Sequence, residues 1–207
     1  WGKDGEFLSA PRLDDLQCAF AALKGFLAGK KSSHLAVCCV LDNEEVGSST
    51  NQGAASTFLY DTLTRMHDSL GHTREDYLIH LADSFMLSAD NAHAVHPNHP
   101  DKSDPSNRPY LNGGIVLKFN ANQKYCTDGI SAAMFRDICN EAGVPVQTFS
   151  NRSDMAGGST LGNISNTQVA LNTADIGLPQ LAMHSPYETA GVEDTEYLIR
   201  AAEKFYC

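Results

Sequence analysis

The chain has 207 residues, 42% of them hydrophobic, so it is long enough to bury one sizeable core, and we expect one compact domain. Its 25 acidic residues outnumber 15 basic ones, which disfavours a nucleic-acid partner because phosphate binding depends on clustered Lys and Arg. No apolar run approaches the roughly 18 to 20 residues of a membrane span, and no charged-then-apolar leader opens the chain, so we expect an unexported protein without membrane contact.

The first part of the chain predicts two helices separated by a strand. Apolar residues recur every three or four positions across 13–28 and Gly29 follows as a terminator, which predicts a helix. The run HLAVCCVL at 34–41 is continuous and rich in branched residues, which predicts a strand buried on both faces of a sheet. A stripe of leucine and methionine predicts a second helix over 53–70.

The next segment combines a helix start, a strand and a long loop. Thr73 followed by Asp76 resembles a capping box, which predicts a third helix. The apolar string SFMLSA predicts a strand that ends at Ala89. Four prolines lie in the stretch 91–112, which is too long for a simple connection and is expected to be a functional or surface loop.

The second half continues the alternation of strands and helices. Strands are predicted at 114–119, 145–150 and 178–183. Three helices are predicted: one at 130–142, one that follows the glycine-rich segment 153–162, and one from about Asp194 to Tyr206. Because strands alternate with helices throughout, we expect an α/β fold, a three-layer sandwich with a mostly parallel central sheet flanked by helices.

Residues able to bind a metal follow three of the expected buried strands. Asp42, Glu44 and Glu45 follow the first, Asp90 the second and His184 the third. Ligands bind beyond the carboxyl ends of strands in open α/β sheets, and carboxylates that converge there repel one another unless a cation neutralises them. A single such carboxylate more often caps a helix or lies in a solvated loop. The coincidence at three strand ends indicates zinc, manganese or cobalt, singly or as a pair.

Five ordered strings carry a resemblance to a known family. They are APRLDDL, LDNEEVGSSTNQGA, SADNAHAVHPN, GIVLKFN and QLAMHSPYE, and the match as a whole extends from Ala10 to about Phe205. The chain resembles the aspartyl aminopeptidases, a branch of the co-catalytic zinc aminopeptidases. The resemblance implies a metalloaminopeptidase that hydrolyses acidic residues, Asp or Glu, from the N-termini of peptides by means of a water held between two metal ions.

The resemblance also implies a role for each residue of the metal site. Asp14 is expected to bridge two zinc ions, Asp90 to bind one of them, and Glu45 with His184 to bind the other. Manganese or cobalt is the alternative metal, since oxygen-rich sites exchange these ions readily. Glu44 is expected to be the general base, because a water shared by two cations is already acidified and needs only a nearby proton acceptor.

A second group of residues is expected to bind the substrate. The resemblance implies that Lys118 contacts the acidic side chain of the first substrate residue, although a surface lysine at a strand end is the simpler interpretation of the position itself. Tyr125, Gly158 and Ser159 resemble further parts of the substrate wall, while His96 is expected to line the pocket. A glycine-rich segment of this kind is also compatible with an ordinary turn, and His96 with a partly buried histidine that satisfies local backbone groups.

The family pattern contains parts that these residues do not match. Its remaining metal ligand is a histidine before the equivalent of Asp14, and a dimerisation domain is inserted between the two. We therefore expect residues 1–207 to be a catalytic, proteolytic domain and an incomplete fragment of a longer chain. The resemblance further implies a large homo-oligomer, commonly a dodecamer, for the complete protein.

Two alternative functions remain open. One is a related di-zinc aminopeptidase for neutral residues, or an amide deacylase, which would not depend on Lys118. The other is a catalytically silent, metal-stabilised binding or scaffold module, which would need ligands but no adjacent base such as Glu44.

The cysteines indicate a compartment rather than a reaction. Six are present without a CxxC pair, and five of them lie in apolar or helix-like stretches, so we expect reduced, mostly buried thiols. No arrangement of Cys and His suggests a nucleophile. These features predict a cytoplasmic protein.

Overall fold

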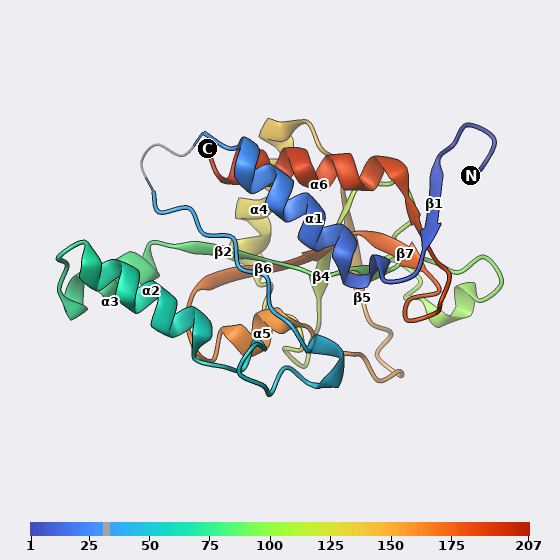
Figure 1. Cartoon of the computed structure of the whole chain (residues 1–207). Helices are drawn as coiled ribbons and strands as arrows, with labels where there is room; N and C mark the ends of the chain where they lie inside the picture. The colour runs from blue at the N-terminus through green and yellow to red at the C-terminus, as the bar shows by residue number, and fades with distance from the viewer. Residues whose placement is uncertain (31–33) are drawn as a thin grey trace.

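A four-stranded sheet carries the core of the protein in the computed structural model, which describes residues 1–30 and 34–207. The strand order is β2-β6-β4-β5, formed by β2 (Phe85–Ala89), β6 (Asn172–Gly177), β4 (Ile115–Phe119) and β5 (Val146–Ser150). β2 and β6 are parallel, as are β4 and β5, whereas β4 and β6 are antiparallel. Two of the three neighbouring pairs are therefore parallel, as a mostly parallel sheet requires (Figure 1).

Helices cover both faces of this sheet. The helices α1 (Leu13–Ala28), α4 (Gly129–Ala142) and α6 (Val192–Phe205) lie on one face, and the short α5 (Leu161–Ser165) lies on the other. Side chains alternate along β4 accordingly: Ile115 and Leu117 pack into the core under the three helices, while Val116 packs on the opposite face. The expected α/β sandwich is confirmed.

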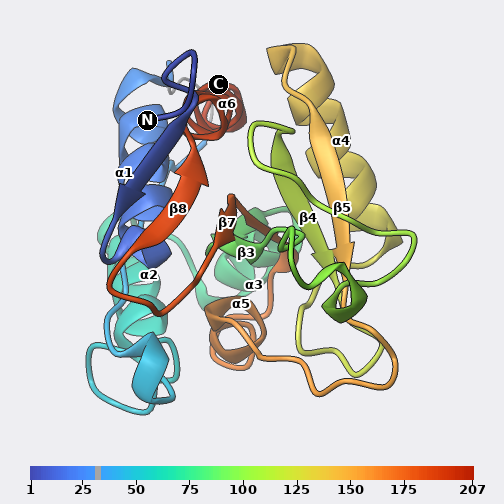
Figure 2. The same ribbon diagram turned by 90° about the vertical axis from the view of Figure 1, so that its right-hand side faces the viewer.

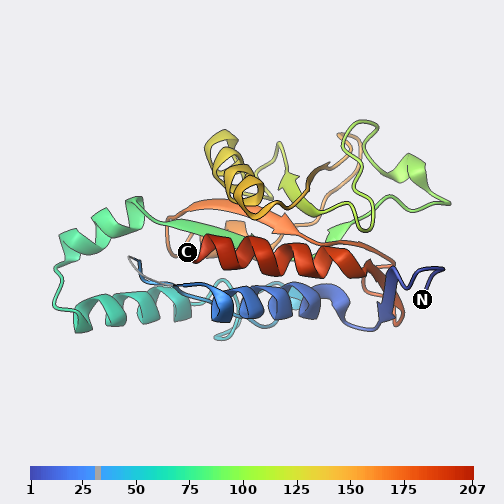
Figure 3. The same cartoon turned by 90° about the horizontal axis from the view of Figure 1, so that it is seen from above.

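The helices α1 and α6 pack side by side, as the view from above shows (Figure 3). Small residues make this close crossing possible. A Cβ atom on Gly25 would lie 2.4 Å from the Cβ of Ala202. The leucine and phenylalanine stripe that predicted α1 is instead exposed on the other side of the helix, at Leu16, Phe20, Leu23 and Leu27.

A second sheet of four short strands lies beside the first (Figure 2). Its order is β1-β8-β7-β3, formed by β1 (Phe7–Ala10), β8 (Glu188–Gly191), β7 (Pro179–Leu181) and β3 (Ala92–His93). β8 pairs antiparallel with both β1 and β7, and β3 pairs parallel with β7. This sheet brings the chain that enters α1 next to the turn between β7 and β8.

The helices α2 (Phe58–Ser69) and α3 (Arg74–Ala82) form a hairpin at one end of the molecule (Figures 1 and 3). Gly71 has φ of +79° in the turn between them, a conformation that favours glycine. Thr73 and Asp76 form the expected capping box, which satisfies free N–H groups at the start of α3.

Two 3₁₀ turns complete the elements outside the sheets. These are η1 (Glu44–Val46) and η2 (Pro100–Lys102), the latter inside the proline-containing loop. No helix among the described residues combines the length and hydropathy that crossing a membrane requires.

The predicted strand at 34–41 is wrong. The segment runs without regular secondary structure, because an apolar run becomes a strand only where a neighbouring strand completes its hydrogen-bond ladder, and no described strand pairs with it. The second helix begins at Phe58 rather than at 53, since turns occupy the residues before it.

The chain between the glycine-rich segment 153–162 and the strand predicted at 178–183 also differs from expectation. The expected helix after the glycine-rich segment is only the short α5, and the strand at 178–183 is limited to β7. The fully embedded strand β6 comes between them. Its sequence NTADIG contains polar residues, so a prediction based on apolar runs did not identify this central strand.

Candidate metal centre

Three predicted metal ligands meet where α1, η1 and the end of β7 approach one another. The Nε2 atom of His184 lies 3.0 Å from Oδ2 of Asp14 and 2.9 Å from Oε1 of Glu45. Asp14 is almost fully buried, whereas the side chains of His184 and Glu45 are open to solvent. The sequence placed these residues 31 and 139 positions apart (Asp14 to Glu45, and Glu45 to His184), and the fold brings them into direct contact.

Glu188, on β8, fixes two of these three residues through their backbones. Its Oε2 accepts a hydrogen bond of 3.0 Å from the N–H of Asp14, and its Oε1 accepts one of 2.7 Å from the N–H of His184. Glu188 is 2% exposed, so both bonds are shielded from water. One buried carboxylate therefore sets the relative position of two metal-ligand candidates.

A second cluster of carboxylates shares Asp14 with the first. The ligand atoms of Asp14, Asp15 and Asp90 all lie within 4.8 Å of one another, as do those of Asp14, Glu45 and His184. Burial, followed by the nearby charges of Asp90 and Glu45, raises the pKa of Asp14 to about 8. Burial and the charge of Asp90 also raise the pKa of Asp15 well above its usual range. Two adjacent groups with a common carboxylate are the arrangement that two bridged cations require.

The donor set fits zinc. With bonds of about 2.0–2.2 Å, tetrahedral zinc ligands stand about 3.3–3.6 Å apart, so the 2.9 and 3.0 Å separations around His184 would widen by only about half an ångström. The imidazole and the carboxylates are also the nitrogen and oxygen ligands that zinc accepts. A cation would offset the repulsion that raises the pKa of Asp14.

Glu44 precedes the predicted ligand Glu45 in η1 and is half-buried. Burial raises its pKa, and the charges of Asp90 and Glu45 raise it further. A carboxylate with a raised pKa is better matched to accepting and returning a proton near neutral pH than an ordinary solvated glutamate.

Lys118 is paired with a predicted ligand rather than exposed at the strand end. Its Nζ lies 3.2 Å from Oδ2 of Asp90 and donates to the carbonyl of Asn91 at 2.8 Å, and the residue is 2% exposed. Burial lowers the pKa of Lys118, but the charges of Asp90, Tyr125 and Asp175 together outweigh it, so the net shift is upward. The ammonium also lies 5.4 Å from the ring centre of Tyr125.

The remaining predicted substrate residues differ in their burial and in their hydrogen-bond partners. Tyr125 is buried and packs against Phe149 beside Lys118. Ser159 and Gly158 are exposed in the loop before α5, where the Ser159 hydroxyl makes only local hydrogen bonds. The Nδ1 of His96 accepts a local bond from the N–H of Asn98.

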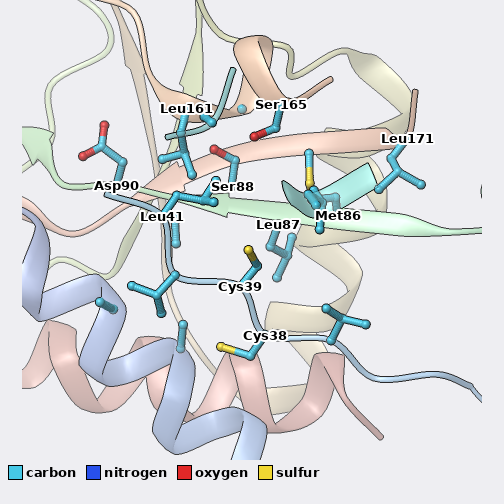
Figure 4. Close-up of a pocket in the computed structure, with 18 of the residues that line it drawn as sticks. Cys38, Cys39, Leu41, Met86, Leu87, Ser88, Asp90, Leu161, Ser165 and Leu171 are labelled. Atoms are coloured by element: carbon cyan, nitrogen blue, oxygen red, sulfur yellow. The ribbon is translucent and has the colours of Figure 1, made fainter. Parts of the chain in front are cut away.

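Two pockets reach the carboxylates of the candidate metal centre. An open one of about 620 Å³ is lined by residues around Asp14, Glu45 and His184. A larger, mostly apolar cavity of about 1310 Å³ extends from Asp90 along β2. Figure 4 shows the segment that carries Cys38, Cys39 and Leu41 beside the strand that carries Met86 and Leu87.

Sequence reasoning missed three residues that build the site. Asp15 and Glu188 lie inside the recognised strings APRLDDL and QLAMHSPYE but received no role. Asn91 is 2% exposed and donates from Nδ2 to the carbonyl of Leu13 and to Oε1 of Gln180, which ties α1 to β7. The place of Asn91 inside the recognised string SADNAHAVHPN, directly after Asp90, was the available signal.

Comparisons with known proteins identify relatives along the whole chain. Residues 1–206 match the family model described as aminopeptidase I zinc metalloprotease (M18). Proteins called probable M18 family aminopeptidase 2 from Clostridium acetobutylicum and Stutzerimonas stutzeri are 48% and 44% identical, each over 99% of this chain and 47% of their own length. The chain thus spans about half the length of these curated relatives.

Solved structures with the same fold come from several organisms. A Thermotoga maritima M18 aminopeptidase superposes with a TM-score of 0.89 at 26% identity, covering 100% of this chain and 47% of its own. The dodecamer of mApe1 from Saccharomyces cerevisiae superposes with a TM-score of 0.86 at 30% identity, with 100% and 47% coverage. An Ape4 chain in complex with Nbr1 reaches 0.93 at 37% identity, with 100% and 40% coverage.

Proposed function

Because the chain belongs to the M18 family of aminopeptidase I zinc metalloproteases, we propose that residues 1–207 form the catalytic domain of an aminopeptidase that removes N-terminal Asp or Glu from peptides. The observation that carries this proposal is the pair of ligand groups that share Asp14. A scaffold protein would need no such pair, and it would need no half-buried Glu44 beside the ligand Glu45.

Two zinc ions are the proposed cofactor, with manganese or cobalt as substitutes. Asp14, Glu45 and His184 would hold one ion, and Asp14 with Asp90 would hold the other, with Asp15 as a neighbouring carboxylate. Bound there, zinc would act as a Lewis acid that polarises the scissile carbonyl and acidifies the attacking water.

Glu44 is the proposed general base. Its carboxylate accepts a proton from the attacking water and later returns it to the leaving amine. The raised pKa of Glu44, which burial and the charges of Asp90 and Glu45 cause, supports both steps because the same group must hold and release a proton. Glu45 is needed as a ligand at the same time, so the two adjacent glutamates have different tasks.

Lys118 is the proposed determinant of acidic specificity. Two of its three ammonium N–H donors are directed to Asp90 and to the carbonyl of Asn91, which leaves one for a substrate carboxylate. The pairing with Asp90 also supports a second candidate function, a di-zinc aminopeptidase for neutral residues, in which Lys118 only orients the ligand. Tyr125, His96, Gly158 and Ser159 remain proposed parts of the substrate wall.

Assembly and location are proposed on separate grounds. The relationship to the dodecameric mApe1 supports a homo-oligomer, with a dodecamer proposed for the complete protein. The six cysteines are all unpaired thiols, which supports a reducing, cytoplasmic compartment.

The test combines metal content with turnover. The complete protein should hold two metal ions per chain at the candidate metal centre and release free aspartate from an aspartyl dipeptide faster than free alanine from the alanyl analogue. In Lys118→Met, the ratio of kcat/KM for the two dipeptides should fall by at least about tenfold. An unchanged ratio would favour the neutral-residue enzyme, and metal binding without turnover of any peptide would favour the scaffold module.

A further inference from the structure

The α2–α3 hairpin contains a histidine cluster that the proposed peptidase does not use. His67 lies in the last turn of α2, His72 in the connecting turn, and His80 in the last turn of α3. Figure 1 shows this hairpin at the end of the molecule away from the start of α1, where Asp14 lies. No hydrogen bond or ion pair of the described residues links the three histidines to the candidate metal centre.

The spacing of the three rings is that of imidazoles around one tetrahedral ion. Nε2 of His67 and Nδ1 of His80 are 3.2 Å apart. Ring centres are separated by 4.7 Å for His67 and His72, and by 5.3 Å for each of the other two pairs. For metal–nitrogen bonds of about 2.0–2.1 Å, tetrahedral geometry places ligating nitrogens about 3.3 Å apart and ring centres about 5.2 Å apart.

The exposed His72 can turn its nitrogen toward the other two rings. A half-turn about χ2 exchanges nitrogen and carbon positions while the ring centre stays in place. The ring-centre distances, which this rotation does not change, therefore decide whether the third ligand can reach. His80 is exposed as well, so both residues can adjust without disturbing the core.

His67 is the buried member of the cluster. It is 8% exposed, and its Nδ1 is buried without a hydrogen-bond partner among the described residues. An ordered water can satisfy Nδ1, while Nε2, the nitrogen that faces His80, is the atom placed to bind an ion. Burial and the nearby charges of His72 and His80 lower the pKa of His67, which favours the neutral ring, the form that binds metals.

The surroundings tolerate a cation. Asp68 and Asp76 are the acidic groups whose charges act on His67. The nearby Arg74 is stacked over the ring of Tyr77 at 4.9 Å, and Tyr77 contacts His67 edge-on. Tyr77 therefore packs against the ring of His67, while His72 and His80 remain exposed to solvent.

We propose that His67, His72 and His80 form a second metal site, which binds one divalent transition-metal ion, zinc or cobalt, and clamps α2 to α3. Three imidazoles with one open position suit zinc and cobalt. The ion would replace the contact between His67 and His80 and tie the connecting turn to both helices. The site is independent of the peptidase proposal, because it shares no ligand with the candidate metal centre.

Cobalt titration of the full chain tests this site, with visible absorption and equilibrium dialysis as readouts. His72→Ala and His80→Ala should each bind one cobalt ion fewer than the wild type, or bind it at least about tenfold more weakly. His34→Ala removes an exposed histidine outside the cluster and should bind as many ions as the wild type. His184→Ala should keep the hairpin site while it weakens the candidate metal centre.

Imidazole NMR signals and thermal unfolding give a second readout. Zinc should shift the ring signals of all three histidines and raise the Tm of the wild type by more than it raises that of His72→Ala. Equal cobalt stoichiometry and affinity in wild type, His72→Ala and His80→Ala would overturn the site. Loss of all binding in His184→Ala would overturn it too, since the cluster would then bind nothing by itself.

Discussion

Two adjacent glutamates, Glu44 and Glu45, have different surroundings although they share one 3₁₀ turn. Glu45 is exposed and touches His184, whereas Glu44 is half-buried and has a raised pKa. Burial and the charges of Asp90 and Glu45 therefore give Glu44 surroundings that suit the proposed base, while the exposed Glu45 lies beside His184 as the proposed ligand.

Replacement of Glu44 by Gln should therefore remove turnover and leave metal content almost unchanged. The amide cannot accept a proton, so kcat should fall by about 10²- to 10⁴-fold. Steady-state kinetics on an aspartyl dipeptide, together with metal analysis, measures both effects. Glu196→Gln, on the exposed side of α6, is the matched control. A rate equal to that of the control would rule out Glu44 as the base.

Glu188 has a positioning role that Glu188→Gln should expose. Glutamine keeps one acceptor oxygen, so only one of the N–H groups of Asp14 and His184 retains its bond. Zinc affinity should drop about 10- to 100-fold. Competition with a chromogenic chelator measures it, and Glu196→Gln again serves as the control. Wild-type affinity in the variant would show that other contacts hold the two residues in place.

At the scale of elements, the α1–α6 pair depends on small residues. A Cβ on Gly25 would meet the Cβ of Ala202 at 2.4 Å and two backbone atoms of α6 at 2.8 Å, so the helices would have to move apart. Gly25→Ala should lower the free energy of unfolding by about 1–3 kcal/mol. Urea denaturation measures it.

Gly129→Ala provides the contrast for that experiment. Gly129 opens α4, and an added Cβ there meets nothing within 4 Å. This variant should unfold within about 1 kcal/mol of the wild type, on the stabilising side. Equal effects of the two substitutions would show that the close approach of α1 and α6 is not what limits the size of residue 25.

Asp194 joins the start of α6 to the chain entering β4. Its carboxylate accepts hydrogen bonds from the N–H groups of Asn112 and Gly114 at 2.6 and 2.9 Å. Burial nevertheless raises the pKa of Asp194 to about 6. Between about pH 4 and pH 6 the folded chain keeps a proton that the unfolded chain has lost, so this residue lowers the free energy of unfolding as pH rises.

Asp194→Asn should remove that pH dependence. The amide can accept only one of the two N–H bonds, so the variant should be less stable by about 1–3 kcal/mol at pH 7. The stability advantage of the wild type should be larger at pH 4, shrink up to about pH 6, and then stay constant. Urea denaturation from pH 4 to pH 7 measures it, with Glu196→Gln on the same helix as the control. An advantage that grows with pH would contradict the assignment.

At the scale of the whole molecule, the large apolar cavity separates segment 34–41 from β2. It has a volume of about 1310 Å³. Among the described strands β2 pairs only with β6, so the other edge of β2 faces this cavity. Apolar surface of this extent binds amphipathic dyes.

The folded chain should therefore enhance the fluorescence of anilinonaphthalene sulfonate. Met86→Glu places a charge on the cavity wall and should reduce the enhancement several-fold, whereas Val192→Glu, at an exposed apolar residue elsewhere, should not. Far-UV and near-UV circular dichroism confirm that both variants are folded. No enhancement with the wild type would mean that the cavity is closed in solution.

The sequence by itself determined the local elements and the chemistry of the ligands. Periodicity and caps identified α1, α3 and α4, because a helix depends on residues within one or two turns. The order of short motifs indicated the family, and Asp14, Glu45 and His184 carried the right donor atoms for zinc.

Only the tertiary structure decided how these parts meet. Segment 34–41 has the composition of a strand but no partner among the described strands, and β6 is a central strand despite its polar residues. Residues that are distant along the chain also meet at the site. Lys118 is buried against Asp90, and Glu188 accepts hydrogen bonds from the N–H groups of Asp14 and His184. Strand pairing, burial and charge proximity are long-range contacts, so local sequence patterns do not specify them.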